Sequence, residues 1–348
     1  MIKRISKKWR FLISLASIII GVILLLVMTN NKTKNLPIPK DAVIATKKPC
    51  ALSGSLVKNT ISKRKPIAVM VENHVDARPQ SGLDKADIIY EGLTEGGITR
   101  FMAVYECQDA NKIGPVRSAR AYFLDWAQEL EAVYAHAGGS KESWERIAVE
   151  PILDINEFFY AQSFWRESKI GKSREHTLYS KISLLRKIAN EKGWNKPIQF
   201  KSWLFKDDPK FDELKNRKTQ MTIDFSRPPF FITYLYDPTN NVYFRTEGGV
   251  AHKDTISKKQ LSPKTVILQF MRSWKSFSYN NVATTSMQTT GTGEATILMD
   301  GKVINATWKK DTIQSRTRFY TIKGKEVQFN RGQFWIEALP IGTPVTIK

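Results

Sequence analysis

The sequence contains little cysteine and histidine, the side chains that most often bind transition metals. Its two cysteines are Cys50 and Cys107, and its four histidines are spread from His74 to His252 without a metal-binding spacing. Neither a GxSxG nor an HExxH motif occurs. We therefore expect no metal centre and no cofactor, and neither motif is present to support a hydrolase.

Acidic residues are also in the minority. The chain of 348 residues has 33 Asp and Glu against 54 Lys and Arg, a formal net charge of +21. Residues 1–66 carry 14 of the basic residues and one acid, so +13 of the excess lies there and +8 remains for the rest. Because the charge is concentrated in this terminal region and not on a recognisable binding module, no nucleic-acid partner is expected.

The segment 11–29, FLISLASIIIGVILLLVMT, is uncharged. Nineteen helical residues span roughly 28 Å, about the thickness of a bilayer core, so the segment predicts one transmembrane signal anchor. Five basic residues precede it, which places the tail 1–10 in the cytoplasm and the body outside the plasma membrane, as a single-pass protein. A cleaved signal peptide is the alternative. Residues 30–65, rich in Lys, Asn, Ser and Pro, are expected to form a flexible basic linker.

The two cysteines lie in the part of the chain that is expected outside the cytoplasm. In an oxidising compartment an even pair is free to oxidise, so a disulfide between Cys50 and Cys107 is predicted. Two unpaired thiols are the alternative.

Beyond the linker, hydrophobic periodicity predicts two domains. Residues 66–196 alternate buried strands, such as IAVMVE at 67–72, with helices at 117–132, from 141 onward and at 181–192, with Ser140 as a helix N-cap. This pattern indicates an α/β or α+β domain. A connecting segment is expected at 197–228, followed at 229–348 by a smaller all-β domain, a sandwich or barrel, made of short β-type runs with hairpin signals.

Polar residues suited to binding are concentrated between Arg78 and Ser140, where apolar runs end in polar clusters. A Gly-Gly-Ser turn between a strand and a helix offers backbone N–H groups to an anion, and arginines offer bidentate contacts. We therefore predict a pocket for an anionic envelope polymer or peptide carboxylate. The competing interpretation is a structural network of salt bridges. The predicted ligand-binding residues are Arg78, Glu91, Glu95, Arg100, Arg117, Ser118, Arg120, His136, Gly138, Gly139 and Ser140.

A cell-envelope hydrolase is the second hypothesis. Glu91 and Glu95 flank one loop and have the residue types of a general acid and base. His136 or His176 would alternatively activate a nearby serine hydroxyl. Converging arginines would favour binding, whereas an accessible carboxylate pair or a hydroxyl in contact with a histidine would favour catalysis.

Three long motifs give the chain a family resemblance. They are RPQSGLDKADIIYEGLTEGGITRFMAVY at 78–105, IGPVRSARAYFLDWAQELEAVYAHAGGS at 113–140 and EHTLYS at 175–180. With GTGEATILMDGKVINATWKK and GKEVQFNRGQFWIEAL nearer the C-terminus, they closely resemble the YerB-like family of bacterial lipoproteins, over about residues 50–348. The resemblance implies an N-terminal domain of unknown function, a β-rich C-terminal domain and an envelope location, but no activity. Many members look like lipoproteins, whereas this chain has an apolar anchor segment instead.

Overall fold

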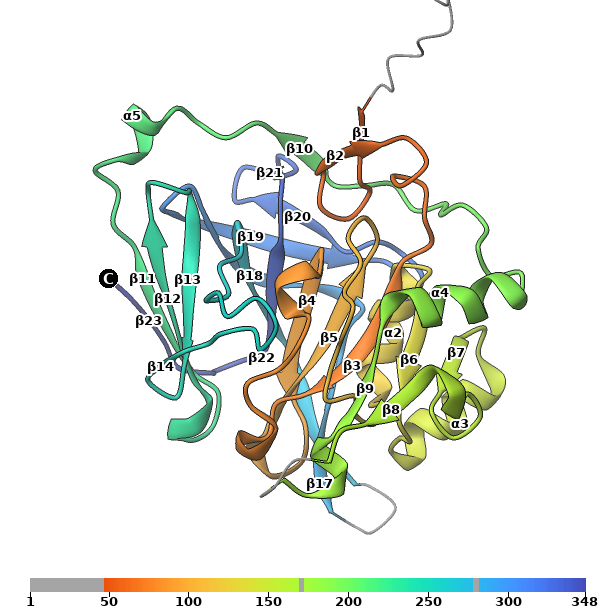
Figure 1. The fold of residues 1–348 in the computed structure, drawn as a ribbon. Helices are drawn as coiled ribbons and strands as arrows, with labels where there is room; N and C mark the ends of the chain where they lie inside the picture. Colours follow the sequence, from red (N-terminus) through yellow and green to blue (C-terminus); the bar gives the residue numbers. More distant parts are fainter. Residues whose placement is uncertain (1–46, 169–171, 278–281) are drawn as a thin grey trace, which may run out of the picture. The chain divides into compact units, whose positions relative to one another are not determined.

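The computed structural model describes residues 47–168, 172–277 and 282–348. It is a mixed α/β structure with a β-rich C-terminal region, organised around one sheet of ten strands (Figure 1). In spatial order the strands are β20 (Arg318–Thr321), β19 (Lys302–Lys310), β18 (Gly291–Met299), β15 (Thr265–Met271), β22 (Phe334–Pro340), β4 (Ile88–Leu93), β5 (Thr99–Tyr105), β3 (Ile67–Glu72), β6 (Val133–His136) and β7 (Leu153–Asn156).

The ten-stranded sheet crosses the division that the sequence suggests between two domains. Strand β22 pairs in parallel with β4 on one side and with β15 on the other, so strands from both halves of the chain form one continuous ladder. The C-terminal strands thus extend the N-terminal sheet, which differs from the expected separate all-β sandwich or barrel. The physical reason is that β4 is buried on both faces and bonds along both edges, a demand that its own hydrophobic run does not reveal.

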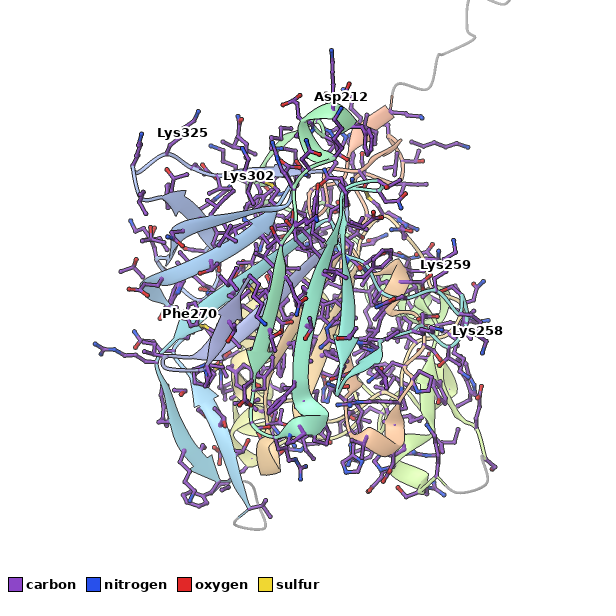
Figure 2. All side chains as sticks on the ribbon, turned by 90° about the vertical axis from the view of Figure 1, so that its left-hand side faces the viewer. Asp212, Lys258, Lys259, Phe270, Lys302 and Lys325 are labelled. Atoms are coloured by element: carbon purple, nitrogen blue, oxygen red, sulfur yellow. A yellow bond between two sulfur atoms is a disulfide. The ribbon has the colours of Figure 1, made fainter. Side chains whose placement is uncertain are left out.

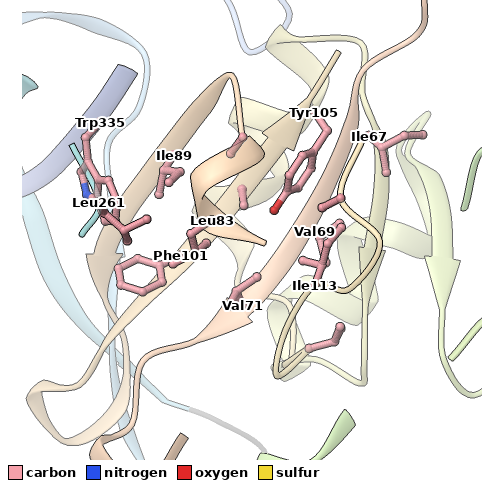
Figure 3. Packing of buried hydrophobic residues seen from close by; sticks show 14 of the residues in the cluster. Ile67, Val69, Val71, Leu83, Ile89, Phe101, Tyr105, Ile113, Leu261 and Trp335 are labelled. Carbon is pink, nitrogen blue, oxygen red and sulfur yellow. The ribbon is translucent and has the colours of Figure 1, made fainter. Parts of the chain in front are cut away.

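Strand β3 illustrates how the two faces of the sheet are covered. Its bounds match the predicted run at 67–72, and its side chains alternate between two cores. Ile67, Val69 and Val71 pack on one side with Phe101 and Tyr105, as Figure 3 shows. The intervening Ala68 and Met70 belong to the opposite core.

A second, five-stranded sheet and one helix cover the Ile67 face. The sheet has the order β14 (Val250–Ala251), β13 (Val242–Glu247), β12 (Phe231–Asp237), β11 (Gln220–Asp224) and β23 (Val345–Ile347). Figure 2 shows it face on, with Lys258 and Lys325 at the outer edges of the view. Helix α4 (Ile182–Glu191) adds Ile182, Leu185 and Ile188 to the same core. Strand β11 lies inside the predicted connecting segment 197–228, so only part of that segment is irregular.

Helix α2 (Ala121–Glu129) covers the other face with the buried Phe123 and Trp126. It begins four residues later than predicted, because Arg117 is held in an extended segment. The Arg117 N–H donates to Met70 O (2.9 Å), and the Ala137 N–H donates to Arg117 O (3.1 Å). Helix α3 (Lys141–Val149) has Ser140 as its N-cap, whose hydroxyl oxygen accepts from the Ser143 N–H at 3.2 Å, which confirms that prediction.

Shorter elements complete the described chain. They are β1 (Lys47–Pro49) with β2 (Leu56–Lys58), β8 (Phe164–Arg166) with β9 (Leu178–Ser180), β10 (Leu204–Lys206) with β21 (Gln328–Asn330), β16 (Ser273–Phe277) with β17 (Ala283–Met287), helix α5 (Phe211–Leu214), and the 3₁₀ turns η1 (Val75–Ala77), η2 (Leu83–Lys85), η3 (Glu95–Gly97), η4 (Ala161–Ser163), η5 (Arg174–His176) and η6 (Pro228–Phe230).

Part of the predicted linker is folded onto the body. Cys50 is fully buried and forms a disulfide with Cys107, with their Cα atoms 6.2 Å apart. The carboxylate of Glu106 accepts from the N–H groups of Ala51 (3.0 Å) and Leu52 (2.8 Å). Burial raises the pKa of Glu106 to about 7. The expectation of a flexible segment therefore fails for residues 47–65, whose polar composition conceals these long-range contacts.

None of the helices in the described residues is long and apolar enough to span a membrane. The predicted anchor at 11–29, the tail 1–10 and residues 30–46 lie outside the residues that the structure describes.

Candidate functional site

The residues singled out in the sequence separate into three places. Arg78 and Glu91 belong to a buried ionic cluster between the two sheets. Glu95, Arg100, Arg117, Ser118 and Arg120 line an open cavity at the end of β3 and β5. The strand-to-helix turn from His136 to Ser140 contributes Gly138 and Gly139 to the wall of a second hollow, described below.

The buried ionic cluster is centred on Arg245 of β13, which is fully buried. Its guanidinium donates to Glu91 Oε2 (2.6 Å) and to the Tyr234 hydroxyl (3.2 Å), and it contacts the ring of His252. Glu91 also accepts from Trp335 Nε1 at 3.1 Å and is 0% exposed. Glu91 therefore has no access to solvent, and the hypothesis that Glu91 and Glu95 face a common ligand is wrong.

The charges in this cluster do not balance in their ordinary ionised states. Burial would lower the pKa of Arg245, but the carboxylates of Glu91 and Glu247 outweigh this effect and raise it. Burial, followed by repulsion from Glu91, raises the pKa of Glu337 well above its ordinary value. Burial, with the neighbouring Arg245, lowers the pKa of His252 well below its ordinary value. We therefore expect a neutral His252 and a proton retained on Glu337.

Arg78 joins the same cluster from the N-terminal half. It lies 3.0 Å from Glu247 Oε1 and donates to Pro229 O (2.7 Å) and to Asn73 Oδ1 (3.1 Å). Both of its side-chain partners are buried. Arg78 therefore connects the N-terminal half of the chain to Glu247 and Pro229 in the C-terminal half, and it does not lie where a ligand would bind.

The open cavity has a volume of about 540 Å³ and is called the arginine cavity below. Its polar lining consists of Glu72, His74, Asp76, Thr94, Glu95, Arg100, Arg117, Ser118, Arg120, Ser173, Glu175 and His176. Three of the four arginines in the predicted pocket thus line this cavity, whereas Arg78 does not, and four carboxylates accompany them. With both histidines neutral, the formal charge of the lining is −1.

Arg120 and Arg100 form the half of the cavity that η3 covers. Arg120 donates two N–H groups to the Glu95 carboxylate, each at 2.6 Å. Arg100 donates one N–H to Ser118 O (2.9 Å), while its Nε is buried without a partner among the described residues and Glu95 is 4.0 Å away. Burial, followed by repulsion from Arg120, lowers the pKa of Arg100 to about 9. Neighbouring carboxylates therefore balance the positive charge of Arg100 only weakly.

The other half of the arginine cavity is built on Glu72, a residue that the sequence analysis did not select. The buried Glu72 carboxylate accepts from Arg117 Nε (2.9 Å) and contacts His176 Nδ1 (2.8 Å). Glu175 lies more loosely, 3.8 Å from Arg117 Nη2 and 3.7 Å from His176 Nε2. Its side chain is 55% exposed, so it is free to move away from both.

A second hollow of about 490 Å³ adjoins the arginine cavity, because Arg117, Ser118 and Glu175 line both. Gly138 and Gly139 form part of its wall, together with Trp144 of α3 and Phe158, whose side chains lie next to these glycines. The rings of Trp144 and Phe158 are stacked with centroids 6.4 Å apart, and Phe158 is 65% exposed. Arg166 and Arg174 add two further guanidinium groups.

The turn from His136 to Ser140 does not offer the free donors that the sequence suggested. The Gly138 N–H donates to Asn156 Oδ1 (3.2 Å), and the Ser140 N–H donates to Ala119 O (3.2 Å). His136 is fully buried, with one ring nitrogen on Gly138 O (2.7 Å) and the other on Asp154 (2.5 Å). The prediction that these groups bind an anion directly is therefore wrong for His136, Gly138 and Ser140. Their contacts instead fix the wall of the second hollow.

The residues that the sequence analysis missed had a weak local signal. Glu72 ends a buried strand and His74 and Asp76 follow it, which is a polar cluster at a strand end of the kind used to select Arg78–Ser140. Their partner His176 lies about a hundred residues further on, as the separation of 104 between Glu72 and His176 shows. No spacing rule connects positions so far apart.

Comparison with known proteins defines the class. Residues 52–195 match the N-terminal domain, and residues 221–336 the C-terminal domain, of the family described as protein of unknown function (DUF3048). The chain belongs to this family.

Its relatives include the protein described as "Putative lipoprotein YerB" of Bacillus subtilis (strain 168), which is 29% identical over 307 residues, covering 86% of this chain and 89% of that protein. The crystal structure of the YerB protein from Bacillus subtilis matches with a TM-score of 0.75 at 27% identity, covering 87% of this chain and all of that one. The resemblance drawn from the long motifs is thereby confirmed.

Proposed function

We propose that the protein is a membrane-tethered extracytoplasmic binding protein whose arginine cavity holds a carboxylate of a cell-envelope polymer or peptide. The location rests on the lipoprotein description of its relative, on the apolar segment 11–29 and on the Cys50–Cys107 disulfide, which is typical of oxidising compartments. The described chain begins at β1, at the opposite end of the body from β17, which packs against η3 beside the cavity (Figure 1). Lys47, where the described chain begins, thus lies at the end of the body far from the cavity (Figure 1).

The observation that carries the proposal is the position of Glu175. Its exposed carboxylate lies near an Arg117 N–H and a His176 nitrogen without making a hydrogen bond of normal length to either. A ligand carboxylate that displaces Glu175 would gain the Arg117 fork and approach the poorly compensated Arg100. The exposed Phe158 and the stacked Trp144 in the adjoining hollow offer a flat apolar surface for the uncharged part of such a ligand.

The binding test uses cell-wall fragments with free carboxylates and the same fragments after amidation of these groups. We expect Arg117→Gln to weaken binding of the free fragments about tenfold to a hundredfold, because hydrogen bonds to charged groups contribute about 1.5–3 kcal/mol. The thermal midpoint should stay within a few degrees of wild type, since Arg117 is partly exposed. Calorimetry on the purified full-length chain gives the affinities.

Two further variants sharpen this test. Glu175→Gln should bind the free fragments at least as tightly as wild type, since it removes a competing carboxylate. Arg331→Gln is the matched control, because Arg331 contacts Gly54 O and Asp207 away from the cavity, and it should bind normally. Equal binding of free and amidated fragments, or an unchanged affinity for Arg117→Gln, would contradict the proposal.

The hydrolase hypothesis gains less support from the structure. Among the hydrogen bonds of the described residues, none joins a serine hydroxyl to a histidine ring, and Ser140 Oγ instead contacts Ser143. Glu95 is held by Arg120, which lowers the pKa of Glu95 despite its burial. A carboxylate with a lowered pKa is a poor general acid at neutral pH.

A further inference from the structure

Two histidines and an aspartate come together at the rim of the arginine cavity. One ligand atom from each of His74, Asp76 and His176 lies within 4.8 Å of the other two. Imidazole nitrogens and carboxylate oxygens are the ligands of zinc sites that keep one position open. We propose that His74, Asp76 and His176 bind one divalent transition-metal ion, zinc by ligand type, with its remaining position facing the cavity. The sequence analysis expected no metal, because His176 lies far from the other two along the chain.

His74 and Asp76 are close to the separation that a metal requires. Tetrahedral zinc with bonds of about 2.0–2.2 Å places its ligand atoms roughly 3.3 Å apart. His74 Nδ1 and Asp76 Oδ2 are 3.5 Å apart. In this arrangement Nδ1 accepts from the Asp76 N–H (3.2 Å), so the nitrogen carries a lone pair, and a metal would have to replace this hydrogen bond. Both side chains are at least partly exposed, so metal binding would require little rearrangement of the core.

His176 is oriented by a buried partner, as metal-binding histidines usually are. Its Nδ1 lies 2.8 Å from Glu72 Oε2, and the other Glu72 oxygen accepts from Arg117. A carboxylate at Nδ1 favours the tautomer with the proton on Nδ1, which leaves a lone pair on Nε2. The ring lies 5.0 Å from that of His74 and nearly parallel to it, so the partly exposed His74 ring must rotate before both rings point a nitrogen at one ion. The exposed carboxylate of Glu175 is 3.7 Å from Nε2 and would move aside or supply a fourth ligand.

The metal would also change the charge of the arginine cavity. The lining has a formal charge of −1, which a divalent ion would convert to +1. A bound ion with an open position would then attract a carboxylate together with the three arginines. The inference goes beyond the proposed function, since metal binding is measurable without any carboxylate ligand.

The test is calorimetric titration of zinc into the chelator-treated full-length chain. We expect one ion per chain. His74→Ala, Asp76→Asn and His176→Ala should each weaken zinc binding at least tenfold. Glu72→Gln keeps all three ligands but loses the orienting carboxylate, and should weaken binding about tenfold to a hundredfold. The control is Asp212→Asn on α5, whose side chain is 84% exposed and which should bind as wild type does.

Circular dichroism of each variant separates loss of a ligand from loss of folding. If the buried His176→Ala variant unfolds, the exposed positions His74 and Asp76 decide the outcome. Absence of saturable zinc binding, or wild-type affinity in both His74→Ala and Asp76→Asn, would overturn the metal site. Zinc binding without carboxylate binding would defeat only the proposed function, and carboxylate binding without zinc binding would defeat only the metal site.

Discussion

Replacement of Arg245 with methionine is expected to destabilise the protein by about 3–5 kcal/mol, the usual cost of removing one partner from a buried ion pair. Arg245 is 0% exposed and holds Glu91 at 2.6 Å, with Glu247 at 3.5 Å. Without the guanidinium, these carboxylates lose their main counter-charge in a site that water does not reach. They would then have to take up protons or draw water between the two sheets.

The measurement is urea unfolding of wild type and variant at neutral pH, followed by circular dichroism. Arg272→Met is the matched control, because Arg272 is exposed, and it should lie within about 0.5 kcal/mol of wild type. Glu91→Gln should fall between the two, since it retains a hydrogen-bonding group. An Arg245→Met variant as stable as Arg272→Met would show that the cluster does not hold the two sheets together.

Removal of the disulfide by the double change Cys50→Ser and Cys107→Ser is expected to cost about 4 kcal/mol. The two cysteines are 57 positions apart, and the chain-entropy model assigns a loop of this length roughly that stabilisation. The bridge also holds Ala51 and Leu52 against the Glu106 carboxylate. We therefore expect the segment before Lys65 to become sensitive to protease in the variant while the sheets remain folded.

Limited proteolysis with mass spectrometry identifies the cut sites, and unfolding of oxidised wild type gives the reference stability. Wild type treated with a reductant should reproduce the double variant, which controls for the serine side chains. Two reactive thiols in unreduced, denatured wild-type protein would contradict the bridge itself.

The structure shows which features short-range patterns can predict. Strand β3 and the Ser140 N-cap depend on neighbouring residues, and both were predictable. The Cys50–Cys107 pair was predictable because the chain contains only these two cysteines. The sequence also indicated that Arg100, Arg117 and Arg120 lie near one another, since all three are at strand ends or in connections at one edge of the sheet.

Other features depend on contacts between distant segments. Glu91 bonds Arg245 across 154 positions, which turned a proposed site residue into a buried structural one. The insertion of β22 beside β4 merges two regions that differ in composition. Glu72 and His176 meet only because the loop before β9 folds back onto the end of β3. Alternation and turn signals report which face of a strand is buried, but not which strand lies beside it.

The central claim is that the arginine cavity and the adjoining second hollow, both lined by Arg117, bind an envelope ligand. Photocrosslinking in living cells tests this claim most directly. A photoreactive phenylalanine analogue replaces Phe158, which lines the second hollow, or Phe211 on α5, which is similarly exposed at 54%. The account predicts crosslinked cell-wall material at position 158, its loss when Arg117→Gln is added, and none at position 211. Equal crosslinking at both positions, or crosslinking at 158 that persists with Arg117→Gln, would contradict it.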